Sequence, residues 1–106
     1  MILTPAAEIH GQRIVKTIGL VKGNTIRARH IGKDILAGLK NLVGGEIEEY
    51  TKMMAEAREQ SLDRMVAEAK ELGANAITDV RFSTSYMMGA ASEILVFGNA
   101  VIVEPE

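Results

Sequence analysis

The sequence predicts a single α+β domain over residues 1–106, in which a small mixed or antiparallel sheet of about three to five strands carries a short and a long helix on one face. Three observations lead to this fold class. A long amphipathic segment lies between Gly44-Gly45 and Gly73, and segments rich in β-branched residues flank the helical region on both sides. A chain of 106 residues is also long enough for one modest core. The predicted element order is β-β-α-α-β-β.

The first part of the chain favours short strands. Ile2–Thr4 is predicted to be a strand that ends before Pro5, which has no N–H to donate to a ladder. Arg13–Val21 is rich in β-branched residues and predicts a second strand. Lys22–Asn24 contains glycine and asparagine, which are typical of turns, so we expect Thr25–Arg27 to be a short return strand.

Helical spacing begins near Lys33 and predicts a helix of about three turns that ends at Gly44-Gly45. A second helix is predicted from Glu46 to Leu72, about 40 Å long at 1.5 Å per residue. The apolar residues of the first helix are Ile35, Leu36, Leu39, Leu42 and Val43. The stripe of the second is Ile47, Tyr50, Met54, Ala57, Ser61, Met65 and Leu72, widened by Met53, Leu62, Val66 and Ala69.

After Gly73 the pattern returns to strands. Asn75–Tyr86 alternates, with Val80, Phe82 and Tyr86 on one side and Asp79, Arg81 and Ser83 on the other. A loop is expected over Met87–Ser92. Glu93–Glu104 is nearly continuously apolar, as in a strand buried on both faces.

These elements pose a packing problem, because two neighbouring helices cover one face of the sheet and no further segment remains for the other. The simplest solution is a second copy of the chain, so we expect a homo-oligomer. The charge distribution is compatible with this. Residues 1–45 hold seven Lys/Arg and two Asp/Glu, and residues 46–106 hold five and twelve. This asymmetry favours contact between the front half of one copy and the back half of the next, or reflects the helix propensity of glutamate.

Composition narrows the function classes. A net charge of −2 argues against nucleic acid as a main partner. The longest apolar runs fall far short of the roughly 18 residues of a membrane span, and the N-terminal residues lack the pattern of a signal peptide. The absence of cysteine excludes disulfides and thiolate sites. We therefore expect a cytoplasmic protein with no membrane partner.

A distinctive set of residues resembles the core signature of the YbjQ-like family, a group of small uncharacterised prokaryotic proteins. The set is Gly44-Gly45-Glu46, Tyr50, Arg58, Arg64-Met65, Ala69, Gly73-Ala74-Asn75-Ala76-Ile77, Arg81-Phe82 and Gly98-Asn99-Ala100-Val101. The resemblance implies a dodecin-like α+β subunit that assembles as a ring of five copies. Family members are often labelled heavy-metal-binding proteins. Where many relatives have Gly-Thr-Ala, this chain has Gly98-Asn99-Ala100.

Metal binding is an alternative function, and without cysteine it would need methionine, histidine and carboxylate ligands. His10 and His30 are far apart in sequence and have no partner at helical spacing, whereas zinc takes three or four protein ligands. Methionines at Met53-Met54 and Met87-Met88 suit soft metals, but methionine is also an ordinary core residue. We therefore predict no metal site and no cofactor.

A basic cluster of Arg27, Arg29 and Lys33 precedes the first predicted helix and is a candidate site for a small anionic ligand, such as a phosphate or carboxylate. The alternative is pairing with acidic residues of a neighbouring copy. Glu46, Tyr50 and Arg58 share part of a helix surface, which is compatible with proton transfer but also with a tyrosine held at a subunit contact. No catalytic residues are predicted, and we expect a non-enzymatic binding or structural module.

Overall fold

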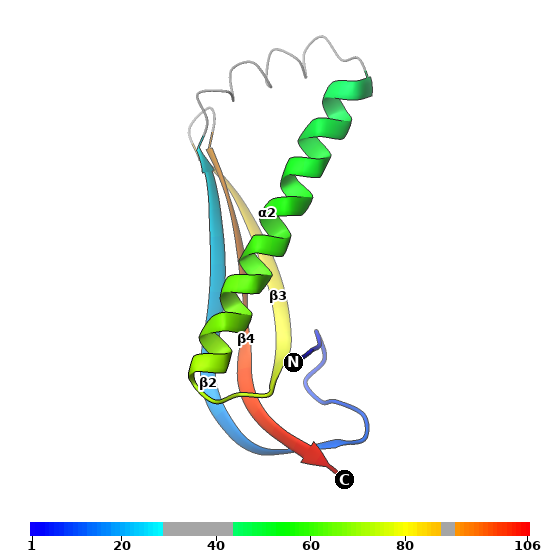
Figure 1. The fold of residues 1–106 in the computed structure, drawn as a ribbon, viewed down its shortest axis with the longest axis vertical. Coiled ribbons are helices and arrows are strands. Elements are labelled where there is room, and N and C mark those ends of the chain that lie inside the picture. Colours follow the sequence, from blue (N-terminus) through cyan, green and yellow to red (C-terminus); the bar gives the residue numbers. More distant parts are fainter. Residues whose placement is uncertain (29–43, 88–90) are drawn as a thin grey trace.

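The computed structural model describes residues 1–28, 44–87 and 91–106. They form β1 (Ile2–Leu3), β2 (Gln12–Ala28), α2 (Gly44–Glu71), β3 (Ala76–Met87) and β4 (Ala91–Pro105). The strand order is β1-β3-β4-β2, with β1 parallel to β3 and the other pairs antiparallel. Figure 1 shows α2 crossing one face of this sheet at an angle. The predicted α+β class is confirmed, and the shorter helix predicted after Lys33 lies outside the described residues.

The long helix is confirmed, with bounds of Gly44–Glu71 instead of Glu46–Leu72. Ala57, Ser61, Met65 and Ala69 follow one another at four-residue steps, and all four are fully buried. Leu72 was predicted to continue this stripe but is 50% exposed. The helix ends before it, because Gly73 takes a positive φ of 87° and the amides of Gly73 and Ala74 donate to the carbonyls of Lys70 and Ala69.

The turn predicted at Lys22–Asn24 is wrong, since β2 is one continuous strand in which Gly23 pairs with Val96 and Asn24 with Leu95. Gly23 serves a close approach of α2 instead. A Cβ placed on it would lie 2.0 Å from the Ser61 carbonyl oxygen and 2.5 Å from the Met65 amide nitrogen. The glycine that suggested a turn is thus present because a helix packs directly on the strand backbone.

The two C-terminal strands form one hairpin, in which β4 extends beyond the predicted Glu93–Glu104 at both ends and β3 is shifted by one residue from the predicted Asn75–Tyr86. Met87 pairs with Ala91, so part of the loop expected over Met87–Ser92 is strand. β3 also contains a β-bulge that was not predicted from the sequence. Thr78 pairs with Asn99 and Arg81 with Phe97, which leaves Asp79 and Val80 opposite Gly98 alone.

The core lies between α2 and the sheet face that it covers. Its main cluster consists of Val21, Met65, Ala69, Ala74, Ile77, Val96 and Ala100. Along β4 from Ser92 to Ala100, every second residue is buried beneath the helix, while Leu95 and Phe97 between them are half-buried. From Ser92 to Ala100, β4 is therefore buried on one face and half-covered on the other. Beyond Ala100, Val101 and Val103 are buried on the other face beside Ile9, so the predicted burial on both faces is met only near the end of the strand.

A buried polar contact fixes the helix on the sheet. The Ser61 hydroxyl lies 2.9 Å from the Thr25 hydroxyl and 3.0 Å from the backbone oxygens of Ala57 and Ile94. Both side chains are almost completely buried, so the Thr25 hydroxyl depends on Ser61 for this bond, whereas the Ser61 hydroxyl also has the two backbone oxygens as acceptors. Within the described residues no helix is both long and apolar enough to cross a membrane.

Candidate interaction surface

The sheet face opposite α2 is called here the open face. Ile9 of the N-terminal segment packs on it at Ala76, Val101 and Val103, and no described element covers the rest. From β2 the open face presents Leu20, Lys22, Asn24 and Ile26, whose partners on β4 are Asn99, Phe97, Leu95 and Glu93. Leu20 is 64% exposed and Ile26 is 51% exposed. Four of these eight side chains are apolar, namely Leu20, Ile26, Leu95 and Phe97.

A second uncovered apolar area lies on the helix side. α2 packs on β2 and β4, and Leu62, Val66 and Val80 are only partly buried where they pack against the core. Phe82 pairs with Val96, so it also points to the helix side, yet it is 48% exposed. We call Leu62, Val66, Val80 and Phe82 the β3 apolar strip.

Both long edges of the sheet carry backbone groups without a strand partner in the part of the chain described. No described strand pairs with the outer edge of β2 along Gln12–Ala28. On the other side, β1 and the segment after it bond to β3 only up to Val80, whose amide donates to the Thr4 carbonyl. From Arg81 to Met87, the backbone at the outer edge of β3 has no described strand partner. Such edges are templates for strand addition.

The charges on these elements differ in sign. The sequence of β2 contains four basic residues and no acidic one. The sequence of α2 contains eight acidic and four basic residues. The ion pair between Arg13 and Glu104 is largely exposed, so it contributes little to stability.

The bulge on β3 gathers polar groups at the open face. Asp79 has a positive φ of 54°, a conformation that aspartate tolerates better than most residues. Its carboxylate accepts hydrogen bonds from Asn99 Nδ2 at 3.1 Å and from Thr78 Oγ1 at 3.3 Å. Gly98 must be small here, because a Cβ on it would lie 2.7 Å from Ile77 Cγ2 and 2.9 Å from the Thr78 carbonyl oxygen. The cluster therefore stabilises the bulge.

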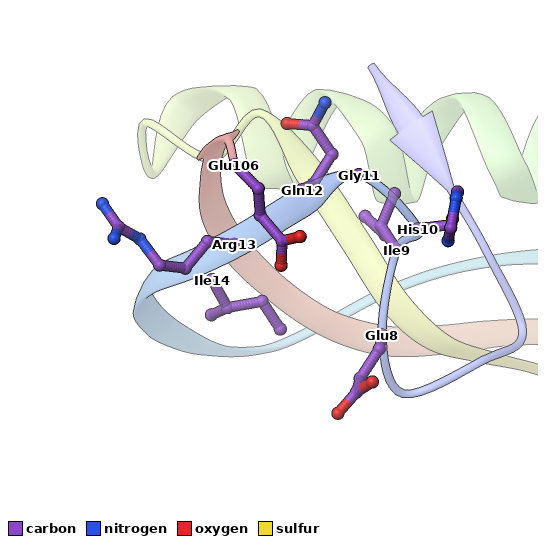
Figure 2. Close-up of a pocket in the computed structure, with 8 residues that line it drawn as sticks. All are labelled: Glu8, Ile9, His10, Gly11, Gln12, Arg13, Ile14 and Glu106. Carbon is purple, nitrogen blue, oxygen red and sulfur yellow. The ribbon is translucent and has the colours of Figure 1, made fainter.

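A hollow of about 540 Å³ lies near the start of β2. It is lined by Glu8, Ile9, His10, Gly11, Gln12, Arg13, Ile14 and Glu106. Figure 2 shows the side chains of Glu8, Gln12 and Arg13 pointing in different directions instead of toward one centre. Because a binding or catalytic site needs convergent polar groups, this hollow does not have the geometry of one.

Comparisons with known proteins place the chain in a family. The model of the YbjQ family, described as "Putative heavy-metal-binding", matches residues 1–104. The chain belongs to the YbjQ family. Relatives named UPF0145 proteins include one from Dehalococcoides mccartyi strain 195, 65% identical over 98% of this chain and 100% of its own length. Another, from Archaeoglobus fulgidus, is 54% identical over 95% of this chain and 94% of its own.

A solved structure supports the fold. It belongs to a protein of unknown function from Pediococcus pentosaceus, assigned to the DUF74 family, and matches with a TM-score of 0.58 at 16% sequence identity. The match covers 100% of this chain and 98% of that one. At this identity it shows the shared fold alone.

The heavy-metal description of the YbjQ family raises the question of which metal-binding side chains lie together in this chain. Residues 1–28, 44–87 and 91–106 bring together no group of three or more His, Cys, Asp or Glu side chains. Structural zinc sites use four protein ligands and catalytic ones three. His10 and Glu8 both line the hollow, but they do not form such a group. Within one chain, this part of the protein offers no donor set for zinc.

The candidate site residues predicted from the sequence lie mostly outside the open face and the β3 apolar strip. Arg29 and Lys33 fall outside the described residues, and Arg27 lies near the end of β2, so the anion site stays a prediction. Glu46 and Tyr50 belong to the first turns of α2, and Arg58 is exposed farther along it. The sequence analysis did not predict the β3 apolar strip. The place of Phe82 beside Val80 on one side of an alternating strand was the only indication of it.

Proposed function

We propose that this protein is a non-catalytic, cytoplasmic module that assembles into a ring of identical subunits and acts in structure or binding. The observation that carries the proposal is the exposure of apolar side chains on both sides of the sheet. Leu20 and Ile26 lie on the open face, and Phe82 lies on the helix side. Exposed apolar areas of this kind mark interaction surfaces.

The accessible surface supports self-association. The chain exposes 6892 Å². A compact monomer of 11.5 kDa is expected to expose about 5,800 Å². The excess of about 1,100 Å² is comparable to the ~800 Å² that each partner buries in a standard protein–protein interface. One chain thus carries roughly the additional surface that a subunit contact removes from solvent.

The elongated shape of the chain also supports self-association. Its radius of gyration is 17.2 Å and its extents are 55 × 22 × 16 Å. Compact domains of this length have a radius of gyration of about 13 Å. Figure 1 shows that the N-terminal part of α2 diverges from the strands instead of lying along them. A subunit that gains cover from its neighbours does not need to be compact alone.

The proposal is tested by the mass of the purified protein in solution. Light scattering after size exclusion, at micromolar and lower concentrations, is expected to give a defined multiple of 11.5 kDa. Five copies is the number implied by the resemblance to YbjQ-like proteins, and native mass spectrometry counts the copies directly. A stable monomer across this concentration range would contradict the proposal.

The alternative, a heavy-metal-binding protein with methionine, histidine and carboxylate ligands, draws its support from the family description. The described part of one chain brings together no three His, Cys, Asp or Glu side chains, so such a site would draw on methionine, on several copies or on residues beyond those described. Elemental analysis of the purified assembly distinguishes the two functions. A stoichiometric metal that survives dialysis would favour the alternative.

A further inference from the structure

We propose that the subunits join head to tail, with β2 of one copy adding to the free edge of β3 in the next, so that the second copy's α2 lies beside the β3 apolar strip. This inference rests on the proposed self-association and names the elements that make the contact. The partner of the free β3 edge is a second copy of the chain.

The directions of the strands permit this addition. β2 and β3 are each antiparallel to β4, so they run parallel to each other within one chain. A second copy displaced sideways along the sheet would place its β2 parallel to β3 and keep its helix on the same side. The free segment of β3, Arg81–Met87, is long enough for an ordinary strand pairing.

The widths of the three strands and of the helix explain why one strand is not covered by the helix. Neighbouring strands lie about 4.8 Å apart, so the three long strands repeat every ~14 Å across a continuous sheet. A helix with its side chains is about 10–12 Å wide. One helix per chain therefore covers β2 and β4 and leaves β3 uncovered. The next copy's α2, about 14 Å away, would lie where Phe82 is exposed.

Charge disfavours a two-fold contact between two β2 edges. Such a pairing would bring two strands together that have four basic residues each and no acidic one. The sequence of β3 contains one acidic and one basic residue, Asp79 and Arg81, so its edge is neutral. A two-fold contact between two β3 edges would leave both β2 edges open. The head-to-tail contact uses both edges and closes into a ring when the rotation allows.

Cysteine cross-linking tests the contact, because the natural chain contains no cysteine. Ser83→Cys places a thiol on the free part of β3, facing the open side. It is combined in turn with Thr17→Cys, Leu20→Cys, Lys22→Cys or Asn24→Cys, which lie on the open face of β2 and sample several registers. Within one chain β4 separates these strands by about 9.6 Å, beyond the ~7 Å that a disulfide spans. Under reducing conditions, each variant must first show the wild-type mass in solution.

After mild oxidation, at least one double variant is expected to give a ladder of covalent oligomers up to the full ring. Each single variant is expected to stay a monomer on a non-reducing gel. A covalent dimer from any single variant would show a two-fold contact and overturn the proposal. If no double variant gives a ladder while light scattering shows an assembly, the head-to-tail edge is wrong and self-association stands. A monomeric wild-type protein removes the proposed function itself.

Discussion

Gly23 of β2 lies directly beneath Ser61 of α2, so close that a Cβ at Gly23 would be 2.0 Å from the Ser61 carbonyl oxygen. Gly23→Ala must therefore push the helix away from the strand. We expect a loss of about 2 kcal/mol or more in the free energy of unfolding, as overpacked cores typically show. Urea denaturation at a fixed protomer concentration measures it.

The control for this substitution is Gly11→Ala. Gly11 has a φ of +79° and no neighbour within 4 Å of an added Cβ, so alanine there tests backbone strain alone. That strain is expected to cost about 1 kcal/mol. Because Gly23 has no such φ, the loss in Gly23→Ala reports the contact with the helix. A Gly23→Ala variant as stable as the wild type would mean that this close approach contributes nothing measurable.

A double-mutant cycle tests the buried hydroxyl pair. Ser61→Ala leaves the Thr25 hydroxyl without its partner in the core, which is expected to cost about 1–3 kcal/mol of unfolding free energy. Thr25→Val added to Ser61→Ala removes the orphaned hydroxyl and should recover part of this loss. Additive losses in the double variant would show that the two hydroxyl groups are not coupled.

Asp79 and Asn99 define the bulge on β3. Asp79→Asn is expected to change unfolding free energy by less than about 0.5 kcal/mol, because asparagine also tolerates a positive φ and offers an oxygen to Asn99. Asp79→Ala should lose about 1–2 kcal/mol, since it removes the hydrogen bonds and disfavours the backbone conformation. Thermal or urea unfolding compares the pair. An alanine variant as stable as the asparagine variant would contradict this account.

Arg81 holds the N-terminal segment against β3, because its guanidinium donates to the Pro5 carbonyl oxygen at 2.7 Å. Arg81→Ala is expected to increase hydrogen exchange at the amides of Thr4, Asp79 and Val80, which bond across this junction. Mass spectrometry of exchanged peptides measures the change. Arg13→Ala, which removes an exposed ion pair with Glu104, serves as control and should leave these amides unaffected.

Phe82 should matter for assembly more than its burial in one chain suggests. Phe82→Ser is expected to weaken each subunit contact by about 1.5–3 kcal/mol, or roughly 10- to 100-fold in dissociation constant. Leu72→Ser is the matched control, since Leu72 is 50% exposed and Phe82 is 48% exposed, but Leu72 lies past the end of α2. Light scattering over a dilution series measures both. Equal weakening by the two substitutions would place the contact elsewhere.

The sequence contains enough information for the helix and most strands. The four-residue steps from Ala57 to Ala69 predict the buried side of α2, because a helix repeats every 3.6 residues. The β-branched segments predict β3 and β4 with modest errors at their ends, and they predict the first half of β2. These signals are local, so they survive without knowledge of the tertiary structure.

Other features depend on contacts through space and could not be predicted. Gly23-Asn24 has the composition of a turn, and only the helix that packs on Gly23 makes it part of a strand. The bulge at Asp79 and Val80 depends on Gly98, which is distant in sequence. The exposure of Phe82 follows from the path of α2 over β2 and β4, which periodicity does not reveal.

The bulge opposite Gly98 has a consequence for how the hairpin of β3 and β4 reaches its final pairing. A slip of one residue would move Gly98 away from Ile77 and Thr78 and bring a bulkier side chain against them. A hairpin with the wrong register is therefore less stable as it forms. The fit of Gly98 against Ile77 and Thr78 selects the correct register during folding, in addition to the apolar pattern.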